Sequence, residues 1–310
     1  MDSRNCACVQ LDAPEMLTRD PIFIGGMFKS GTSLLRAMLG RHSRFFAGLE
    51  TQWLAQDRQG IAPENRRAWL ERLAIFYEVP CAALEQAVGD ATQVEICLDR
   101  LMAFLARREG KPRWVEKTPY NAGHIDRILS AWPGAKMIHV VRDPRDVYAS
   151  MVEIGKWSEP AVFAEHWCNT VGLARDWLST QGGVHPSYHE LRYERLVLAP
   201  EATMREVVVF LGEAREPEIA RFEGRPQDLE RVQRATGKLS STLKRLATPL
   251  TDSRIGIWRS PIGEERWGPV QAELERRGRG ALVRSLTSET DAICAEAAEM
   301  GYAGLVERSP

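Results

Sequence analysis

The stretch PIFIGGMFKSGTSLLRAML, residues 21–39, joins a short apolar run, a loop with glycines and an amphipathic segment. This order predicts a buried strand, a phosphate-binding loop and a helix over about residues 32–41. The nucleotide-hydrolysing form of such a loop, G-x-x-x-x-G-K-[ST], places a lysine directly after the second glycine. Here Thr32 follows Gly31, and the lysine stands upstream at Lys29. The loop therefore predicts an anion site without the usual grip on the β- and γ-phosphates of a nucleotide.

The chemistry of this first anion site follows from the residue types in the loop. A helix N-terminus presents unpaired N–H groups and a partial positive charge, which bind phosphate or sulfate without a metal. Gly26 and Gly31 allow a tight backbone turn over an anion. Thr32 and Ser33 add hydroxyl donors, and Lys29 adds a full charge. A plain glycine turn between strand and helix is the alternative, but the lysine and the hydroxyls favour the anion site.

The rest of the chain alternates between strand-like and helix-like segments. Strand patterns cover residues 113–117, 136–142 and 187–194. Helical patterns cover 64–110 with a break near Val79–Pro80, 121–132, a segment from Pro144, 160–180 and 200–211. This alternation predicts an α/β fold, a P-loop-like parallel sheet flanked by helices on both faces.

The domain organisation follows from the same patterns. We expect residues 1–20 to be irregular and residues 21–310 to form a single α/β domain. Within it, a helical insert is expected at about 51–110 and a helical C-terminal tail at about 264–302. Residues 213–260 have few periodic apolar positions and are predicted to be largely loop with short helices.

A second anion site is indicated by RDPRDVYAS, residues 142–150. Arg142 ends the strongest strand pattern, and open parallel sheets bind ligands at the carboxyl ends of their strands. Ser150 lies about two turns into the following helix, so both side chains can close on one phosphate.

Helix capping is the alternative interpretation of this segment. Asp143 before a proline is a good N-cap, and Arg145 and Asp146 would then be surface charges. Capping does not account for Arg142, so a second anion site is favoured. Two anion sites without a magnesium motif predict a ligand that is phosphorylated at two separated points, and no metal site.

Composition excludes some classes of partner. The formal net charge of −1 argues against a general binder of nucleic acid or of anionic membranes. The N-terminal residues lack an apolar core of signal-peptide length, and no stretch approaches the ~20 apolar residues of a membrane span. We therefore expect a cytoplasmic protein with no nucleic-acid partner and no membrane span. The oligomeric state stays open.

The two anion motifs together resemble the 5′- and 3′-phosphate motifs of PAPS-dependent sulfotransferases, where PAPS is 3′-phosphoadenosine 5′-phosphosulfate. KSGTS (29–33) follows a strand, and R-x7-S (142–150) follows a later one. GTSLLRAMLGRHSRFFAGLET (31–51) is similar to the corresponding stretch of tyrosylprotein sulfotransferases. EKTP (116–119) and Y-E-x-L-V (193–197) occur in the family's order. The resemblance covers about residues 21–260.

This resemblance implies the sulfotransferase fold, with PAPS as co-substrate and PAP as product. Lys29 falls on the residue that stabilises the bridging oxygen, although tyrosylprotein enzymes carry arginine at this position. The residues implied to hold the 5′ group are Lys29, Ser30, Gly31, Thr32 and Ser33. Arg142 and Ser150 are implied to hold the 3′-phosphate.

The resemblance also implies the catalytic residues and the C-terminal end of the cofactor site. Glu50 falls on a general base and Lys117 on a catalytic lysine, while Tyr193 falls on a cofactor-contacting tyrosine. Thr242 falls on the family's serine in the C-terminal cofactor loop. Ile257 stands where a lysine is expected, and Arg254 and Arg259 are the candidate substitutes.

Several alternatives stay open from the sequence. His124 is the alternative base, whereas His139 lies in an apolar strand and is expected to be a core residue. Trp53 and Trp157 are candidates to line the acceptor pocket, with core packing as the other interpretation.

The function predicted is sulfuryl transfer from PAPS to an acceptor hydroxyl, which we expect on a small or lipid-like compound. The alternatives are a tyrosylprotein (peptide) sulfotransferase, a P-loop kinase-like nucleotide phosphotransferase and a non-catalytic nucleotide-binding protein.

Overall fold

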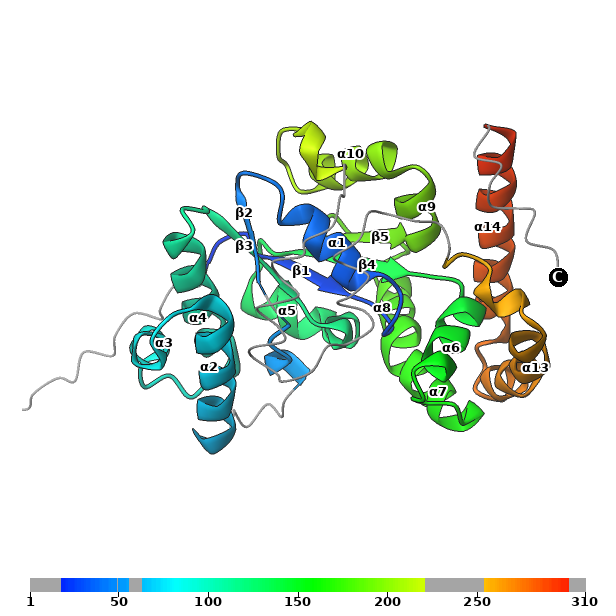
Figure 1. Ribbon diagram of the computed structural model, residues 1–310, viewed down its shortest axis with the longest axis horizontal. Helices are drawn as coiled ribbons and strands as arrows, with labels where there is room; N and C mark the ends of the chain where they lie inside the picture. The colour runs from blue at the N-terminus through cyan, green and yellow to red at the C-terminus, as the bar shows by residue number, and fades with distance from the viewer. Residues whose placement is uncertain (1–17, 49, 56–62, 221–253, 301–310) are drawn as a thin grey trace, which may run out of the picture.

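The computed structural model describes residues 18–48, 50–55, 63–220 and 254–300, and a five-stranded sheet lies at its centre (Figure 1). The strands are β1 (Ile22–Gly25), β2 (Phe45–Ala47), β3 (Arg113–Lys117), β4 (Lys136–Val141) and β5 (Tyr188–Arg192). Their order is β2-β3-β1-β4-β5, and every neighbouring pair is parallel. The predicted parallel sheet is confirmed.

Both faces of the sheet are covered, as the apolar strands require. Ile22 and Ile24 of β1 pack into one cluster, while Phe23 between them packs into another. The first cluster joins the sheet to α1 (Thr32–Leu39), α9 (Tyr193–Leu198) and α10 (Pro200–Phe210). The second joins it to α4 (Val94–Arg108), α5 (Ile125–Ala131) and α8 (Leu173–Thr180). Because side chains alternate along a strand, each strand contributes to both layers.

The predicted helical insert is three helices, α2 (Pro63–Tyr77), α3 (Cys81–Val88) and α4. The break expected near Val79–Pro80 is confirmed. A second break follows Val88, where Gly89 adopts φ 64° and ends α3. A residue with positive φ is a common helix terminator, and glycine takes it without steric cost.

A third apolar cluster lies at the opposite end of the molecule from this insert (Figure 1). It packs α6 (Pro144–Glu153) and α7 (Pro160–Trp167) against α13 (Pro261–Arg276) and α14 (Gly280–Glu299). The predicted C-terminal helical tail is thus two helices, separated at Gly278, which has φ 73°.

The helix predicted over 160–180 is continuous but not uniform. Between α7 and α8, residues Cys168–Gly172 form a π-helical segment, η3. Such segments are rare and accommodate an extra residue within a helix.

Three local predictions differ from the structure. β2 was not predicted, because Phe45–Ala47 is too short to show alternation. The strand predicted over 187–194 ends at Arg192, and Tyr193 opens α9 instead. Tyr193, Leu196 and Val197 are buried at helical spacing, which explains the change of period there.

The third difference concerns the helix predicted from residue 121. A 3-10 turn, η2 (Pro119–Gly123), precedes α5, which begins only at Ile125. Two short 3-10 turns, η4 (Pro217–Ile219) and η5 (Ile257–Arg259), bracket the undescribed residues 221–253. Within the described ranges, none of the helices is long and apolar enough to cross a bilayer.

The tight turn after β1 gives a stability prediction. Gly26 has φ 147°, and a Cβ there would lie 2.3 Å from the carbonyl oxygen of Val140 in β4. Replacement of Gly26 by alanine should lower the free energy of unfolding by about 1–3 kcal/mol or more, since both strain and a clash result. Gly268→Ala is the control, because Gly268 lies in α13 with open space around it, and should be neutral or stabilising by about 0.5–1 kcal/mol. Urea denaturation of both variants tests this, and equal stabilities would contradict it.

Candidate active site

The loop after β1 ends in a helix N-terminus that faces it. Gly31 caps α1 in the left-handed region at φ 96°, without a side-chain cap. Lys29 also has a positive φ of 70°, uncommon for a residue with a side chain. The chain turns through an N–H bond from Ser30 to the Met27 carbonyl at 3.1 Å. No acidic residue occupies the first turn of α1, so its N–H groups and partial positive charge remain available to an anion.

Tyr193 lies directly against this loop. A Cβ at Gly31 would be 2.4 Å from Cδ2 of the Tyr193 ring, so only glycine fits there without displacing the ring. The guanidinium carbon of Arg142 lies 4.6 Å from the centre of the same ring. Tyr193 therefore sits between the two predicted anion motifs.

Arg142 joins the first loop to a later segment. Its Nη1 donates to the backbone carbonyl of Lys29 at 2.9 Å, and its Nη2 donates to the backbone carbonyl of Arg254. Arg254 in turn donates from Nη2 to Ser150 Oγ at 3.1 Å. The structure thus brings Lys29, Arg142, Ser150 and Tyr193 together, and Arg254 joins them.

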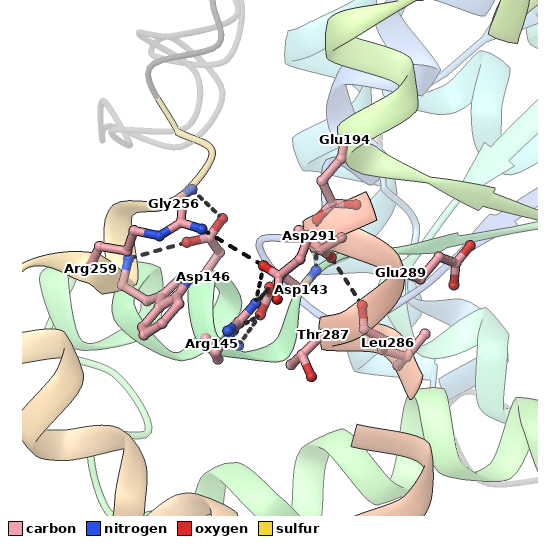
Figure 2. Close-up of polar contacts among 12 residues, drawn as sticks. Asp143, Arg145, Asp146, Glu194, Gly256, Arg259, Leu286, Thr287, Glu289 and Asp291 are labelled. Carbon is pink, nitrogen blue, oxygen red and sulfur yellow. Dashed lines mark hydrogen bonds and ion pairs between the residues drawn. The ribbon is translucent and has the colours of Figure 1, made fainter. Parts of the chain in front are cut away.

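Arg259, the other candidate substitute for the family lysine, points elsewhere. Its Nη2 lies 3.7 Å from Asp291 on α14, and it packs near Trp258 (Figure 2). Thr242, the remaining cofactor candidate, lies outside the described residues. Geometry therefore associates Arg254, and not Arg259, with Ser150.

Three buried polar atoms at this junction lack partners within the part of the chain that the structure describes. They are Ser30 Oγ, Arg142 Nε and Arg254 Nε. Buried polar atoms are almost always hydrogen-bonded, so these three are available to a ligand that reaches the junction. All three can donate, and an anion with several acceptor oxygens satisfies that set. The residues present therefore fit a phosphorylated ligand.

A second group of residues forms at the end of β3. Glu116 is 1% exposed, and its Oε1 accepts hydrogen bonds from the Thr51 N–H at 3.1 Å and from Thr51 Oγ1 at 2.9 Å. Thr118 Oγ1 accepts the N–H of Gln52 at 3.0 Å. The residues on both sides of Lys117 thereby fix the segment that follows Glu50.

Glu116 also ties this segment to β1. Asn121 Nδ2 donates to Glu116 Oε2 at 2.6 Å and to the Ile24 carbonyl at 3.1 Å. In the sheet, Ile24 pairs in register with Lys117. The segment at Glu50 is therefore held beside the strand that leads into the first anion loop.

Glu50 and Lys117 form an ion pair in this frame. Lys117 Nζ lies 2.6 Å from Glu50 Oε2, and Gln52 Nε2 donates to Glu50 Oε1 at 2.8 Å. Burial acts to raise the pKa of Glu50, but the charge and hydrogen bond of Lys117, the hydrogen bond of Gln52 and the charge of Arg72 together outweigh it. The pKa of Glu50 consequently lies below its ordinary value, and the carboxylate is ionised at neutral pH.

Half-buried aromatic side chains line the neighbouring region. Phe28, next to Lys29 in the chain, makes edge-to-face contacts with Tyr120 at 5.2 Å and with Trp157 at 5.1 Å between ring centres. Trp157 stacks on His166 at 3.8 Å, and Tyr120 Oη lies 3.2 Å from His166 Nδ1. We call Phe28, Tyr120, Trp157 and His166 the aromatic wall.

The aromatic wall lies within electrostatic range of the ion pair. Burial raises the pKa of Tyr120, and the charge of Glu50 adds to that rise. Burial also lowers the pKa of His166, so its imidazole is neutral at pH 7. Trp53, the other predicted pocket residue, is fully buried in the core cluster with α4, so the pocket interpretation of Trp53 is wrong.

The two other histidines differ in their surroundings. His139 is fully buried on β4, with Nδ1 2.6 Å from Tyr188 Oη, and burial lowers its pKa to about 3. It is a core residue, as predicted. His124 is half-buried, and its backbone carbonyl begins α5 by accepting the Ile128 N–H.

Sequence reasoning did not identify Asp146 and Glu116 as buried carboxylates. The cap at Asp143 is confirmed, because its side chain accepts the Arg145 N–H at 2.8 Å. The alternative in which Arg145 and Asp146 are surface charges is wrong, since Asp146 is 0% exposed and Arg145 pairs with Asp143 and Asp291 (Figure 2). Glu116 is the second such carboxylate. Its place directly before Lys117 in EKTP was the available signal.

The chain belongs to the sulfotransferase family, whose sequence pattern matches residues 21–217. Protein-tyrosine sulfotransferase of Drosophila melanogaster is 27% identical over 207 residues, covering 61% of this chain and 37% of the fly protein. Protein-tyrosine sulfotransferase 2 of Gallus gallus is 26% identical over 241 residues, covering 70% of this chain and 59% of the chicken protein. The chain thus spans less than two thirds of the length of these relatives.

Solved structures agree with the fold. The sulfotransferase domain from the curacin biosynthetic pathway matches with a TM-score of 0.58 at 21% identity, over 83% of this chain and 98% of that domain. The sulfotransferase domain of the Synechococcus PCC 7002 olefin synthase matches with a TM-score of 0.57 at 20% identity, over 84% and 96%. The predicted sulfotransferase fold and the local similarity to tyrosylprotein sulfotransferases are confirmed.

Proposed function

We propose that this protein transfers the sulfuryl group of PAPS to an acceptor hydroxyl. The observation that carries the proposal is the junction at Arg142, which joins the Lys29 loop to Arg254 and Ser150. A ligand with anions at two separated points matches this arrangement of donors at neighbouring strand ends.

The donor nucleotide is assigned to the two loops by the charge and orientation of their donors. Ser30, Gly31, Thr32 and Ser33 would surround the 5′ group at the N-terminus of α1. Arg142, Ser150 and Arg254 would surround the 3′-phosphate. Tyr193, packed against both Gly31 and Arg142, would contact the nucleotide between these two ends.

Transfer requires a base for the acceptor and a positive charge near the leaving oxygen. We assign Glu50 to take the proton of the acceptor hydroxyl. The acceptor oxygen then bonds to sulfur as the bond between sulfur and the 5′-phosphate oxygen breaks. Lys29 would stabilise the charge that develops on this leaving oxygen, and Lys117 would keep Glu50 ionised and in position.

For the acceptor we propose a small or lipid-like hydroxyl compound. Phe28 of the aromatic wall precedes Lys29 in the chain, and Tyr120 lies within electrostatic range of Glu50, so the partly exposed rings offer apolar contact area near both. The tyrosylprotein relatives favour a peptide tyrosine as the second candidate. That candidate needs a basic cleft for acidic residues around the target. Arg72, whose Nη2 donates to the Glu50 carbonyl at 3.4 Å, would contribute to such a cleft, whereas Arg127 is already paired with Glu95.

The donor assignment predicts selective binding of adenosine 3′,5′-bisphosphate over ATP with magnesium. Arg142→Ala should weaken bisphosphate binding by roughly 1.5–3 kcal/mol, because a charge-assisted contact is lost. Isothermal calorimetry measures both. Arg113→Ala is the matched control, since Arg113 is also buried and donates to two backbone carbonyls, but at the opposite end of β3. Tight binding of ATP without binding of the bisphosphate would favour a kinase-like phosphotransferase instead.

Glu50→Gln should retain nucleotide binding and reduce turnover by about 10²–10⁴-fold, the usual contribution of a general base. The pKa of Glu50 lies below its ordinary value, so protonation of this group should reduce kcat/KM only at pH values below the ordinary titration range of a glutamate. A pH–rate profile with labelled PAPS checks this. An acid limb near about 6.5, the ordinary pKa of histidine, would point to His124 as the base instead.

The aromatic wall predicts a separation of acceptor from donor affinity. Trp157→Ala should weaken binding of a ring-bearing alcohol by about 0.5–1.5 kcal/mol and leave the KM for PAPS unchanged. Trp177→Ala is the control, because Trp177 is also half-buried but hydrogen-bonds Asp126 away from the wall. A mass-spectrometric screen of phenols, alcohols and an acidic tyrosine peptide supplies the acceptor. Sulfation of the peptide alone would overturn the small-acceptor proposal.

A further inference from the structure

The segment Arg254–Trp258 runs along α6, and one carboxylate of α6 holds its backbone. Asp146 Oδ2 accepts the N–H of Gly256 at 2.9 Å, and Asp146 Oδ1 accepts the N–H of Trp258 at 3.2 Å. Figure 2 shows Asp146 pointing from α6 toward this segment. Both carboxylate oxygens are thus used by backbone donors of the same short turn.

Burying the carboxylate of Asp146 costs free energy unless other groups compensate its charge. Asp146 is 0% exposed, and a buried carboxylate needs hydrogen bonds or a counter-charge to be tolerated. Its counter-charge is Arg142, whose Nη2 lies 3.6 Å from Asp146 Oδ2. Helix capping does not explain the burial of Asp146, because Asp143 already caps α6.

The fastened segment carries Arg254 to the second anion site. The carbonyl of Arg254 accepts from Arg142, and its guanidinium contacts Ser150 and Glu153. Ser150 lies four residues after Asp146, so both side chains share one face of α6. The same helix face therefore holds the backbone of the segment and receives its charged side chain.

A second contact supports the segment from its other side. The guanidinium carbon of Arg145 lies 4.1 Å from the ring centre of Trp258, and Arg145 is itself held by Asp143 and by Asp291 of α14. Asp146 therefore holds the backbone of the turn at Gly256 by hydrogen bonds, and Arg145 contacts the Trp258 ring of the same turn. Arg254 lies two residues before Gly256.

We propose that Asp146 is a positioning residue that holds Arg254 at the 3′-phosphate subsite and thereby sets selectivity for 3′-phosphorylated nucleotides. The inference rests on the proposed donor, PAPS. Asp146 does not contact the ligand. It acts through the two N–H groups of the Arg254 turn, and a purely structural role would lower stability without changing which nucleotide is preferred.

The test is the ratio of the dissociation constants of 5′-AMP and adenosine 3′,5′-bisphosphate, measured by calorimetry. This ratio cancels contacts to adenine and the 5′-phosphate and reports the 3′-phosphate alone. Asp146→Asn should lower the ratio by about tenfold, the equivalent of one charge-assisted hydrogen bond, and leave AMP affinity unchanged. Asp99→Asn is the matched control, because Asp99 is also buried and accepts two N–H donors, from Thr18 and Trp132, away from α6.

A double-mutant cycle with Arg254→Ala identifies the route of the effect. If Asp146 acts by placing Arg254, the double variant should be no worse than Arg254→Ala alone. Additive losses would overturn the assignment, because they would mean that Asp146 acts through Arg142.

A pair of variants in the turn covers the case in which Asp146→Asn does not fold. Trp258→Pro removes one N–H donated to Asp146, whereas Trp258→Ala keeps it and removes only the ring. The proline variant should lower the nucleotide ratio by more than the alanine variant does, because the alanine variant loses only the ring contact with Arg145. Equal ratios in the two variants, or an unchanged ratio in a folded Asp146→Asn, contradict the proposal. A wild-type protein with no preference for the bisphosphate would refute the proposed donor itself.

Discussion

The guanidinium of Arg142 is the interaction on which the arrangement of the site depends. It leaves the end of β4 and donates to the backbone of two segments that are more than 200 residues apart, at Lys29 and Arg254. A guanidinium is suited to this because its donors lie in a fixed plane and its charge does not titrate. Through it, the loop after β1 and the segment beside α6 take up one relative position.

The second fixed point of the site is Glu116, and it works by a different principle. Its carboxylate is buried, and it accepts hydrogen bonds from Thr51, Thr118 and Asn121. Burial raises the pKa of Glu116, which these hydrogen bonds oppose. Lys117, the next residue, points to Glu50 and keeps that carboxylate ionised. Two adjacent residues of β3 thus have different roles: Glu116 fixes the backbone after Glu50, and Lys117 helps to lower the pKa of Glu50.

The fold was predictable from the sequence because strand-like and helix-like patterns alternate along the chain. The loop at Lys29 and the pair Arg142 and Ser150 were predictable for a related reason, since charged residues at strand ends stand out against an apolar background. The partners of Arg142 were not predictable, because backbone carbonyls leave no trace in the sequence. Asp146 looked like a surface charge, since nothing local distinguishes a buried aspartate from an exposed one. The prediction that Trp53 lines a pocket was wrong because a tryptophan in a short turn can occur equally well in a pocket and in a core. Tyr193 was placed on a strand, although its neighbours already had helical spacing.

The π segment at Cys168–Gly172 limits which deletions this protein can tolerate during evolution. An α-helix turns by about 100° per residue, so one extra residue rotates all that precedes it relative to α8. His166 lies on the preceding side, and its contacts with Tyr120 and Trp157 depend on that rotation. Loss of a single codon from this stretch would restore regular helix and turn His166 away while every side chain of the aromatic wall remained encoded. The arrangement of the aromatic wall therefore depends on the number of residues in the π segment as well as on the identity of its own residues.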